Sequence, residues 1–271
     1  MVVFEKVKVS EVSKLIPDGF CKLEPKTIYE KFRCSRQGVT IILYSSGKLL
    51  LQGKPENVEN VAKILRKKQI GKEVKPESFR KETGWIIGSD ESLKGDSFGG
   101  LVVAAVKADN KTRKALLEIG VADSKKLKDL EILDMAKTIK QMVSCHIISL
   151  LPEAYNKGPG QTKLLNQLHQ QTAKYLGNGQ HVVDKYPGCK VGDIQETKAE
   201  SKYLEVAAAS ILARAEALKQ MDYLTRQAGF PLPKGSTHVT DAIKQLQQQK
   251  LPPAKFLKMH FSNVRDILNS N

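Results

Sequence analysis

Two adjacent carboxylates, Asp90 and Glu91, are the residues of this chain best suited to chemistry. They follow the apolar stretch 85–88, and a Lys-Gly turn at 94–95 leads from them into the apolar run 101–106. Two like charges at the end of a strand raise each other's pKa unless a cation lies between them. A hard divalent ion such as Mg²⁺ or Mn²⁺ suits a site made only of oxygen ligands. The segment therefore predicts a metal-dependent active site.

Two further acidic residues stand beside apolar elements. Asp184 ends the predicted strand 181–183, as Asp90 ends its own, and Glu200 precedes a helix predicted at 202–227. That helix is rich in small residues, which let it approach a sheet closely and bring its first turn near the strand ends. Spacing alone favours Glu200 as an acid that complements the helix dipole. It fits Asp184 equally well as a turn residue or as a ligand.

Apolar strands and helical periodicity alternate along the chain from residue 84 onward. The predicted strands are 85–88, 101–106, 145–150 and 181–183. The predicted helices are 127–140, 162–176, 202–227 and 239–249. This alternation predicts an α/β fold in which helices cover a mixed sheet.

The first part of the chain has the pattern of a small α+β unit. Its predicted strands are 2–9, 28–34, 39–44 and 48–52, and its predicted helices start at Ser10 and Pro55. Residues 69–83 lack apolar periodicity and mix Gly and Pro with many charges, which is typical of an interdomain linker. The predicted domains are therefore 1–68 and 84–271, joined by a linker at 69–83.

The composition is that of a globular, strongly basic protein. Of 271 residues, 41% are hydrophobic, and no apolar run is long enough for a transmembrane helix or has the form of a secretory signal. The four cysteines have no metal-binding spacing, which indicates reduced thiols in a cytoplasmic protein. The net charge of +15 alone fits nucleic-acid binding and ordinary solubility equally well. Residues 1–75 hold 16 Lys and Arg against 8 Asp and Glu, which indicates a basic docking module.

The histidines are scattered, and none forms a metal-binding pair. Most are predicted to be surface or packing residues: His146, His169, His181, His238 and His260.

The catalytic segment of the type 2 ribonucleases H, and most closely of ribonuclease HIII, resembles residues 90–106 of this chain. That family reads roughly DEVGKGDYFGPLVVAAV where this chain reads DESLKGDSFGGLVVAAV. The likeness continues, in the family's order, at 38–40, 44–53, 123–127, 184, 197–203, 206–214 and 257–261. Matches in the right order over nearly the whole chain make the resemblance specific.

The resemblance implies an RNase H-like mixed sheet, preceded by a small domain similar to a TATA-binding-protein repeat that grips the substrate. It also implies a two-ion Mg²⁺ or Mn²⁺ site whose carboxylates are Asp90, Glu91, Asp184 and Glu200. This implication overrides the structural interpretations of Asp184 and Glu200 given above. Glutamate at the last position matches the ribonuclease HIII branch, whereas ribonuclease HII has aspartate there.

The resemblance also implies contacts to the substrate. They fall on four residues of one turn: Ser92, Leu93, Lys94 and Gly95. In the family the backbone of this turn contacts the ribose 2′-hydroxyl, which separates RNA from DNA. The chain departs from the pattern with Ser-Leu at 92–93 in place of Val-Gly, and with Gly100 in place of Pro. Ser124 and Lys125 match a phosphate-contacting segment, although a helix cap and a solvent-facing lysine explain them equally well.

The implied activity is metal-dependent hydrolysis of the RNA strand of RNA–DNA hybrids to 5′-phosphate and 3′-hydroxyl ends. An enzyme that prefers single ribonucleotides embedded in duplex DNA is the first alternative, because of the departure at 92–93. A catalytically silent hybrid-binding protein is the second. We expect a cytoplasmic monomer with no membrane association and no obligate protein partner.

Overall fold

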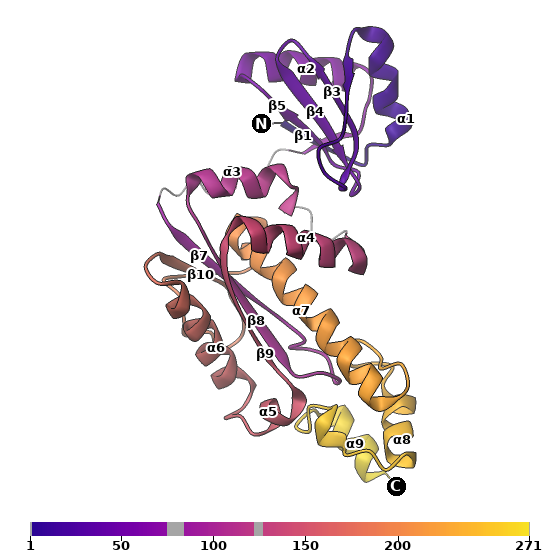
Figure 1. Cartoon of the computed structure of the whole chain (residues 1–271), viewed down its shortest axis with the longest axis vertical. Coiled ribbons are helices and arrows are strands. Elements are labelled where there is room, and N and C mark those ends of the chain that lie inside the picture. Colours follow the sequence, from indigo (N-terminus) through magenta and orange to yellow (C-terminus); the bar gives the residue numbers. More distant parts are fainter. Residues whose placement is uncertain (1, 75–83, 122–126, 271) are drawn as a thin grey trace. The chain divides into compact units, whose positions relative to one another are not determined.

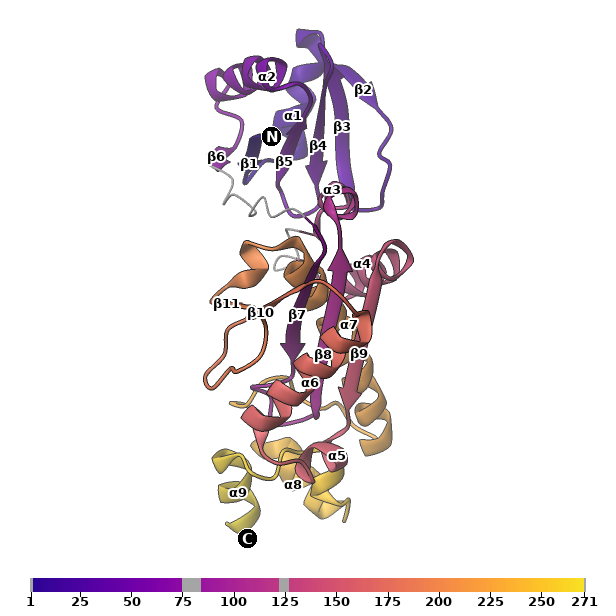
Figure 2. The same cartoon turned by 90° about the vertical axis from the view of Figure 1, so that its left-hand side faces the viewer.

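The computed structural model describes residues 2–74, 84–121 and 127–270. They form two compact units, one of residues 1–81 with 117–131 and the other of residues 82–116 with 132–271 (Figure 1; Figure 2). The described residues 117–121 and 127–131 are grouped with the first unit. None of the helices in the described residues is both long and apolar enough to cross a membrane.

The first unit is built on an antiparallel sheet with the strand order β2-β3-β4-β5-β1-β6. The strands are β1 (Val2–Glu5), β2 (Cys21–Leu23), β3 (Glu30–Arg36), β4 (Val39–Tyr44), β5 (Leu49–Gln52) and β6 (Lys72–Val74). The expected hairpin of β3 and β4 is confirmed, with Cys34 opposite Ile41. At its tip, Gln37 and Gly38 both have positive φ, as a two-residue turn of this kind requires.

Helices cover one face of this first sheet. They are α1 (Val9–Val12), the 3-10 helix η1 (Ser13–Asp18) and α2 (Pro55–Lys67). The periodicity of α2 places Val58, Val61 and Leu65 on one side, where each is at most 2% exposed. They share a core with strand residues such as Phe32 and Leu43. The amphipathic face of α2 was therefore predictable from spacing.

Part of the expected linker 69–83 belongs to the sheet instead. Lys72–Val74 form β6, which pairs with β1 so that Val74 lies opposite Val3. Residues 75–83 lie outside the described residues. A short edge strand satisfies backbone groups of β1 without needing an alternating apolar face, so periodicity did not reveal it. The strand expected at 2–9 ends early, at Glu5, because Lys6 has a φ of 60° and leaves the extended path.

The second unit contains a mixed sheet with the order β11-β10-β7-β8-β9. The strands are β7 (Ile86–Ser92), β8 (Leu101–Ala108), β9 (Ser144–Leu150), β10 (Gln180–Asp184) and β11 (Ile194–Glu196). β7, β8 and β9 are antiparallel, whereas β10 pairs parallel with both β7 and β11. The predicted α/β class with a mixed sheet is confirmed.

Two long helices cover opposite faces of this second sheet, α6 (Gln161–Leu176) and α7 (Leu204–Ala228) (Figure 1). The shorter helices are α3 (Asn110–Glu118), α4 (Asp129–Met142), α5 (Pro152–Asn156), η3 (Ala199–Ser201), α8 (Thr240–Gln248), η4 (Pro253–Lys255) and α9 (Ser262–Asn269). The first turn of α7 lies directly on β7, because a Cβ on Gly88 would stand 2.3 Å from the backbone nitrogen of Val206. The close approach expected from the small residues of α7 is confirmed.

The acid pair lies within β7 rather than at its end, so that part of the prediction is wrong. Asp90 pairs with Ala104 and Glu91 with Val103, and the ladder continues to Ser92. The backbone of β8 is long enough to extend the pairing past the apolar residues of β7, and backbone hydrogen bonds do not depend on side-chain polarity. Successive residues of a strand point to opposite faces, so the two carboxylates leave the sheet on different sides.

Candidate active site

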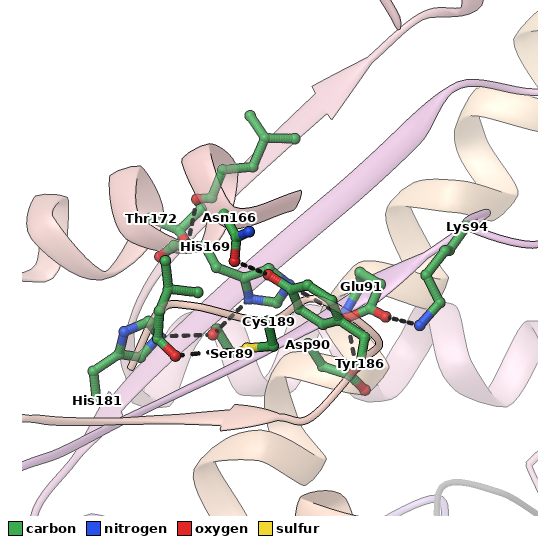
Figure 3. Close-up of polar contacts among 12 residues, drawn as sticks. Ser89, Asp90, Glu91, Lys94, Asn166, His169, Thr172, His181, Tyr186 and Cys189 are labelled. Carbon is green, nitrogen blue, oxygen red and sulfur yellow. Dashed lines mark hydrogen bonds and ion pairs between the residues drawn. The ribbon is translucent and has the colours of Figure 1, made fainter. Parts of the chain in front are cut away.

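Strand β7 presents its residues alternately to α7 and to α6 (Figure 3). Gly88 faces the backbone of α7, and Asp90, two residues on, accepts a hydrogen bond from the Ser210 hydroxyl of the same helix. Ser89 and Glu91 face α6, where both approach His169. The site is therefore assembled on the central strand of the sheet, between two covering helices.

Asp90 is a buried acid with incomplete charge compensation. Its side chain accepts hydrogen bonds from the backbone N–H of Glu91, at 2.8 Å, and from Ser210. Burial, followed by the negative charge of Glu91, nevertheless raises the pKa of Asp90 well above its usual range. The aspartate therefore lies where an added cation would be strongly favourable.

Glu91 is compensated by two side chains, one on each of its oxygens. Lys94 forms an ion pair with Oε1, while Nε2 of His169 lies 3.3 Å from Oε2. Burial alone would raise the pKa of Glu91, but His169 and Lys94 outweigh it and hold the pKa below its usual range. Glu91 is therefore the more acidic member of the adjacent pair.

Asp184 ends β10, as expected, and lies beside β7 through the parallel pairing of the two strands. Its Oδ1 accepts a hydrogen bond of 3.0 Å from the backbone N–H of Ala199 in η3, the short helix that carries Glu200. Burial, and then the charges of Glu200 and Glu91, raise the pKa of Asp184. The structure thus brings the four predicted carboxylates into electrostatic contact from three elements.

This cluster has the donor chemistry of a site for hard cations, since all four groups offer oxygen. Within the residues that the structure describes, no three His, Cys, Asp or Glu side chains form a ready-made metal site. Lys94 forms an ion pair with Oε1 of Glu91, and Nε2 of His169 lies 3.3 Å from Oε2. The Lys94 side chain is 36% exposed and can move away, so the cluster can open to a cation without disturbing the buried side.

The turn after β7 keeps a left-handed residue although glycine is absent there. Leu93 has a φ of 65°, and its side chain is only 7% exposed, with Cδ1 packed against Gly99. The ammonium of the fully buried Lys258 donates to the carbonyls of Asp96 and Gly99 further along the turn. Buried contacts therefore hold the path of the backbone that follows the acid pair.

Of the other predicted contact residues, Gly95 is open, since a Cβ there would meet nothing within 4 Å. Ser92 is the last residue of β7, and Lys94 lies against Glu91. Ser124 and Lys125 lie outside the described residues.

Two histidines of the site were missed by sequence reasoning. His169 and His181, expected to be surface or packing residues, both contact the Ser89 hydroxyl at 2.8 Å. Burial, followed by the charge of His169, lowers the pKa of His181 to about 4. Periodicity could have placed His169 on the buried face of α6 with Leu165 and Leu168, but no sequence signal pairs it with a residue of β7.

Comparisons with known proteins bear on this geometry. Residues 87–264 match the sequence model of the family Ribonuclease HII. The protein named Ribonuclease HIII of Bacillus velezensis is 35% identical over 269 residues, and the match covers 86% of each chain. The chain belongs to the ribonuclease HIII family. The family member of Bacillus subtilis is 33% identical, with the same coverage. The protein is accordingly an endonuclease, a ribonuclease H of type 2.

Solved structures of the family show the same fold. Bst-RNase HIII in complex with Mn²⁺ superposes with a TM-score of 0.63 at 27% identity, covering 98% of this chain and 97% of the other. For the Aquifex aeolicus RNase H3 the TM-score is 0.58 at 28% identity, with 96% and 100% covered. The RNase HII of Archaeoglobus fulgidus, solved with PCNA, covers only 66% of this chain. The RNase H-like fold class is confirmed.

The structure explains one departure from the family pattern. The backbone N–H of Gly100 donates a 2.7 Å hydrogen bond to Oε1 of Gln220 in α7, which a proline at this position could not do. The amide nitrogen of Gln220 in turn donates to Ser149 and Leu150 of β9. A Cβ on Gly100 would stand 1.9 Å from the carbonyl oxygen of Leu150. Gly100 and Gln220 therefore belong together in this chain.

Proposed function

We propose that this chain is a metal-dependent endonuclease that cuts the RNA strand of RNA–DNA hybrids and leaves 5′-phosphate and 3′-hydroxyl ends. The observation that carries the proposal is the carboxylate cluster. Asp90, Glu91, Asp184 and Glu200 come from β7, β10 and η3; the charges of Glu91 and Asp184 raise the pKa of Asp90, and those of Glu200 and Glu91 raise the pKa of Asp184. Family membership supports hybrids as the substrate, and Mn²⁺ is bound in the structure of Bst-RNase HIII.

The four carboxylates would hold one or, as we propose, two divalent cations. Mg²⁺ and Mn²⁺ prefer such hard oxygen ligands, and a cation would relieve the repulsion and burial that raise the pKa of Asp90 and Asp184. Such cations, when bound, would lower the pKa of an attacking water and stabilise the charge on the leaving oxygen. Lys94 would exchange its contact with Glu91 for one with a substrate phosphate, since it is the exposed partner of that carboxylate.

The turn after β7 would recognise ribose through its backbone. Gly95 leaves that backbone open on its outer side, and the left-handed Leu93 keeps the turn on a path that a glycine would take. Ser92 and Lys94 flank this contact. Recognition of the 2′-hydroxyl here would restrict cleavage to RNA.

The first unit would grip the hybrid. Residues 1–68 correspond to the TATA-binding-protein-like domain implied by the family, and residues 1–75 carry a net charge of +8. Neutralising phosphates releases counterions and gives affinity that depends on salt. Ser124 and Lys125 would add phosphate contacts. We place the enzyme in the cytoplasm as a monomer.

A preference for single ribonucleotides in duplex DNA is the second candidate, because Ser92 and Leu93 replace Val-Gly. The burial of Leu93 argues for hybrids, since its side chain packs into the protein rather than toward the substrate. A silent hybrid-binding protein is the third candidate. The presence of all four carboxylates argues against it.

Cleavage of two labelled substrates tests the proposal. The purified protein is incubated with an RNA–DNA hybrid and with duplex DNA that carries one ribonucleotide, each in Mg²⁺, Mn²⁺ or EDTA. We expect the hybrid to be cut in a divalent ion and not in EDTA, and the product ends to carry 5′-phosphate. Cleavage of only the single-ribonucleotide duplex would favour the second candidate. Binding without cleavage in any ion would favour the silent protein.

A further inference from the structure

A buried chain of polar side chains runs from β10 through β7 to the site. The Ser89 hydroxyl lies 2.8 Å from Nδ1 of His169 and 2.8 Å from Nε2 of His181 (Figure 3). His169 on α6 is 0% exposed, and its other ring nitrogen, Nε2, faces Oε2 of Glu91 at 3.3 Å. Two buried imidazoles are costly unless their nitrogens are satisfied, so an arrangement of this kind in a core needs an explanation.

The contacts restrict where the protons of His169 can be. A serine hydroxyl donates one hydrogen bond and accepts others, and a neutral imidazole has one N–H and one lone pair. If Ser89 donates to Nδ1 of His169, the remaining proton of a neutral ring must lie on Nε2. If Nδ1 instead donates to Ser89, the ring satisfies Glu91 only when Nε2 is also protonated. The array in which Ser89 donates to Nδ1 is the one that lets a neutral His169 direct an N–H at Nε2 toward Oε2 of Glu91, 3.3 Å away.

His181 acts as donor or acceptor toward the Ser89 hydroxyl, depending on the direction of the hydroxyl proton. It donates from Nε2 when the hydroxyl proton points to His169, and accepts when that proton points to His181. The backbone N–H of His181 donates a 2.8 Å hydrogen bond to Oδ2 of Asp193, which fixes the backbone that carries the imidazole ring. The three residues are thus one unit, although they come from separate elements.

We propose that the Ser89–His169–His181 unit positions Glu91 for metal binding, with His169 holding Oε2 so that Oε1 is presented to the cation. This inference rests on the proposed function, because it takes Glu91 as a metal ligand. Carboxylates that bind metals are themselves commonly oriented by hydrogen bonds, and removing such a partner weakens metal affinity by about 10- to 100-fold. His169 is a positioning residue and does not touch the substrate.

The two partners of Glu91 differ in the way the inference requires. Lys94 is 36% exposed on a turn and can leave Oε1. His169 is enclosed on α6, with the ring of Tyr186 centred 5.4 Å from its own, and cannot leave Oε2. A cation would therefore displace lysine and leave histidine in place.

Metal affinity of the full-length protein, measured by calorimetric titration of Mn²⁺ without substrate, tests the inference. We expect His169→Leu to weaken Mn²⁺ binding by about 10- to 100-fold. His169→Gln should recover most of that loss, because its amide can place an N–H near the position of Nε2. Ser89→Ala should weaken Mn²⁺ binding less than His169→Leu. It removes the hydroxyl that fixes the tautomer of His169 but leaves the imidazole ring in place.

Three comparisons make the outcome decisive. His146→Leu, which removes an imidazole stacked on Tyr175 at the surface of the same unit, should leave affinity unchanged. Thermal stability is recorded for each variant. If His169 had only a structural role, both His169→Leu and His169→Gln would be less stable, and glutamine would not restore Mn²⁺ affinity. Cleavage at saturating Mn²⁺ should be faster in His169→Gln than in His169→Leu.

The possible failures are distinguishable. If Asp184→Asn abolishes Mn²⁺ binding while His169→Leu binds as the wild type does, the inference is overturned and the proposed function stands. If His169→Gln binds no better than His169→Leu although both are folded, the donor role is wrong. If the wild type neither binds Mn²⁺ nor cleaves a hybrid, the inference fails together with the proposed function.

Discussion

Leu93 offers a stability test of the turn beside the acid pair. A non-glycine residue in the left-handed region is strained by about 1–2 kcal/mol, and the φ of Leu93 is 65°. Its side chain is buried against Gly99, which offsets that strain. Replacing it by alanine keeps the strain and loses the packing, so Leu93→Ala should cost about 2–5 kcal/mol.

Leu93→Gly loses the same packing but removes the strain. Glycine usually costs about 0.5–1 kcal/mol relative to alanine, because the unfolded chain gains freedom. At a left-handed position the relief exceeds this cost, so Leu93→Gly should be more stable than Leu93→Ala by about 0.5–1 kcal/mol. The order of the two variants is thus the reverse of the ordinary one.

Urea denaturation of both variants measures the difference, provided that the dependence on denaturant is the same for each. Gly95→Ala is the matched control in the same turn, because its Cβ would meet nothing and its φ is not left-handed. That variant should be as stable as the wild type or slightly more so, by up to about 1 kcal/mol. If Leu93→Ala is as stable as Leu93→Gly, the left-handed conformation of residue 93 is refuted.

Three other predictions follow from the packing and the charges. Gly88→Ala should push α7 away from β7 by about 1 Å. We expect the free energy of unfolding, measured by thermal denaturation, to fall by about 1–3 kcal/mol or more, and the cleavage rate to fall about 100-fold. Burial lowers the pKa of Lys258 to about 7 from 10.5, despite the opposing charge of Asp96. Between those pH values the unfolded chain holds a proton that the native chain lacks, so stability relative to Lys258→Met should rise with pH. Deleting residues 1–75 should lower hybrid affinity and flatten its dependence on salt, and unchanged affinity would show that this module is not the docking surface.

Sequence patterns predicted the parts of the fold that depend on side-chain burial. Apolar runs located β8 and β10, and the small residues of α7 predicted its close approach to the sheet, which the structure places at Gly88. The short strands β2, β6 and β11 escaped notice, because a three-residue strand depends on backbone pairing and leaves almost no periodic signal.

The candidate site was predictable only in part. Adjacency and charge singled out Asp90 and Glu91, whereas spacing could not separate Glu200 from an ordinary acid at a helix start, and the family resemblance was needed. His169 and Ser89 are 80 residues apart, and only the packing of α6 on the sheet brings them together. Long-range polar contacts of this kind leave no local pattern to recognise.

The central claim is that the four clustered carboxylates carry metal-dependent cleavage. The most direct measurement compares hybrid cleavage in Mn²⁺ by the wild type and by Asp90→Asn, Glu91→Gln, Asp184→Asn and Glu200→Gln. Folding and hybrid affinity are checked for each variant. We expect every variant to bind the hybrid but to lose about 100-fold or more in rate. Cleavage by folded Asp184→Asn at the wild-type rate would contradict the account.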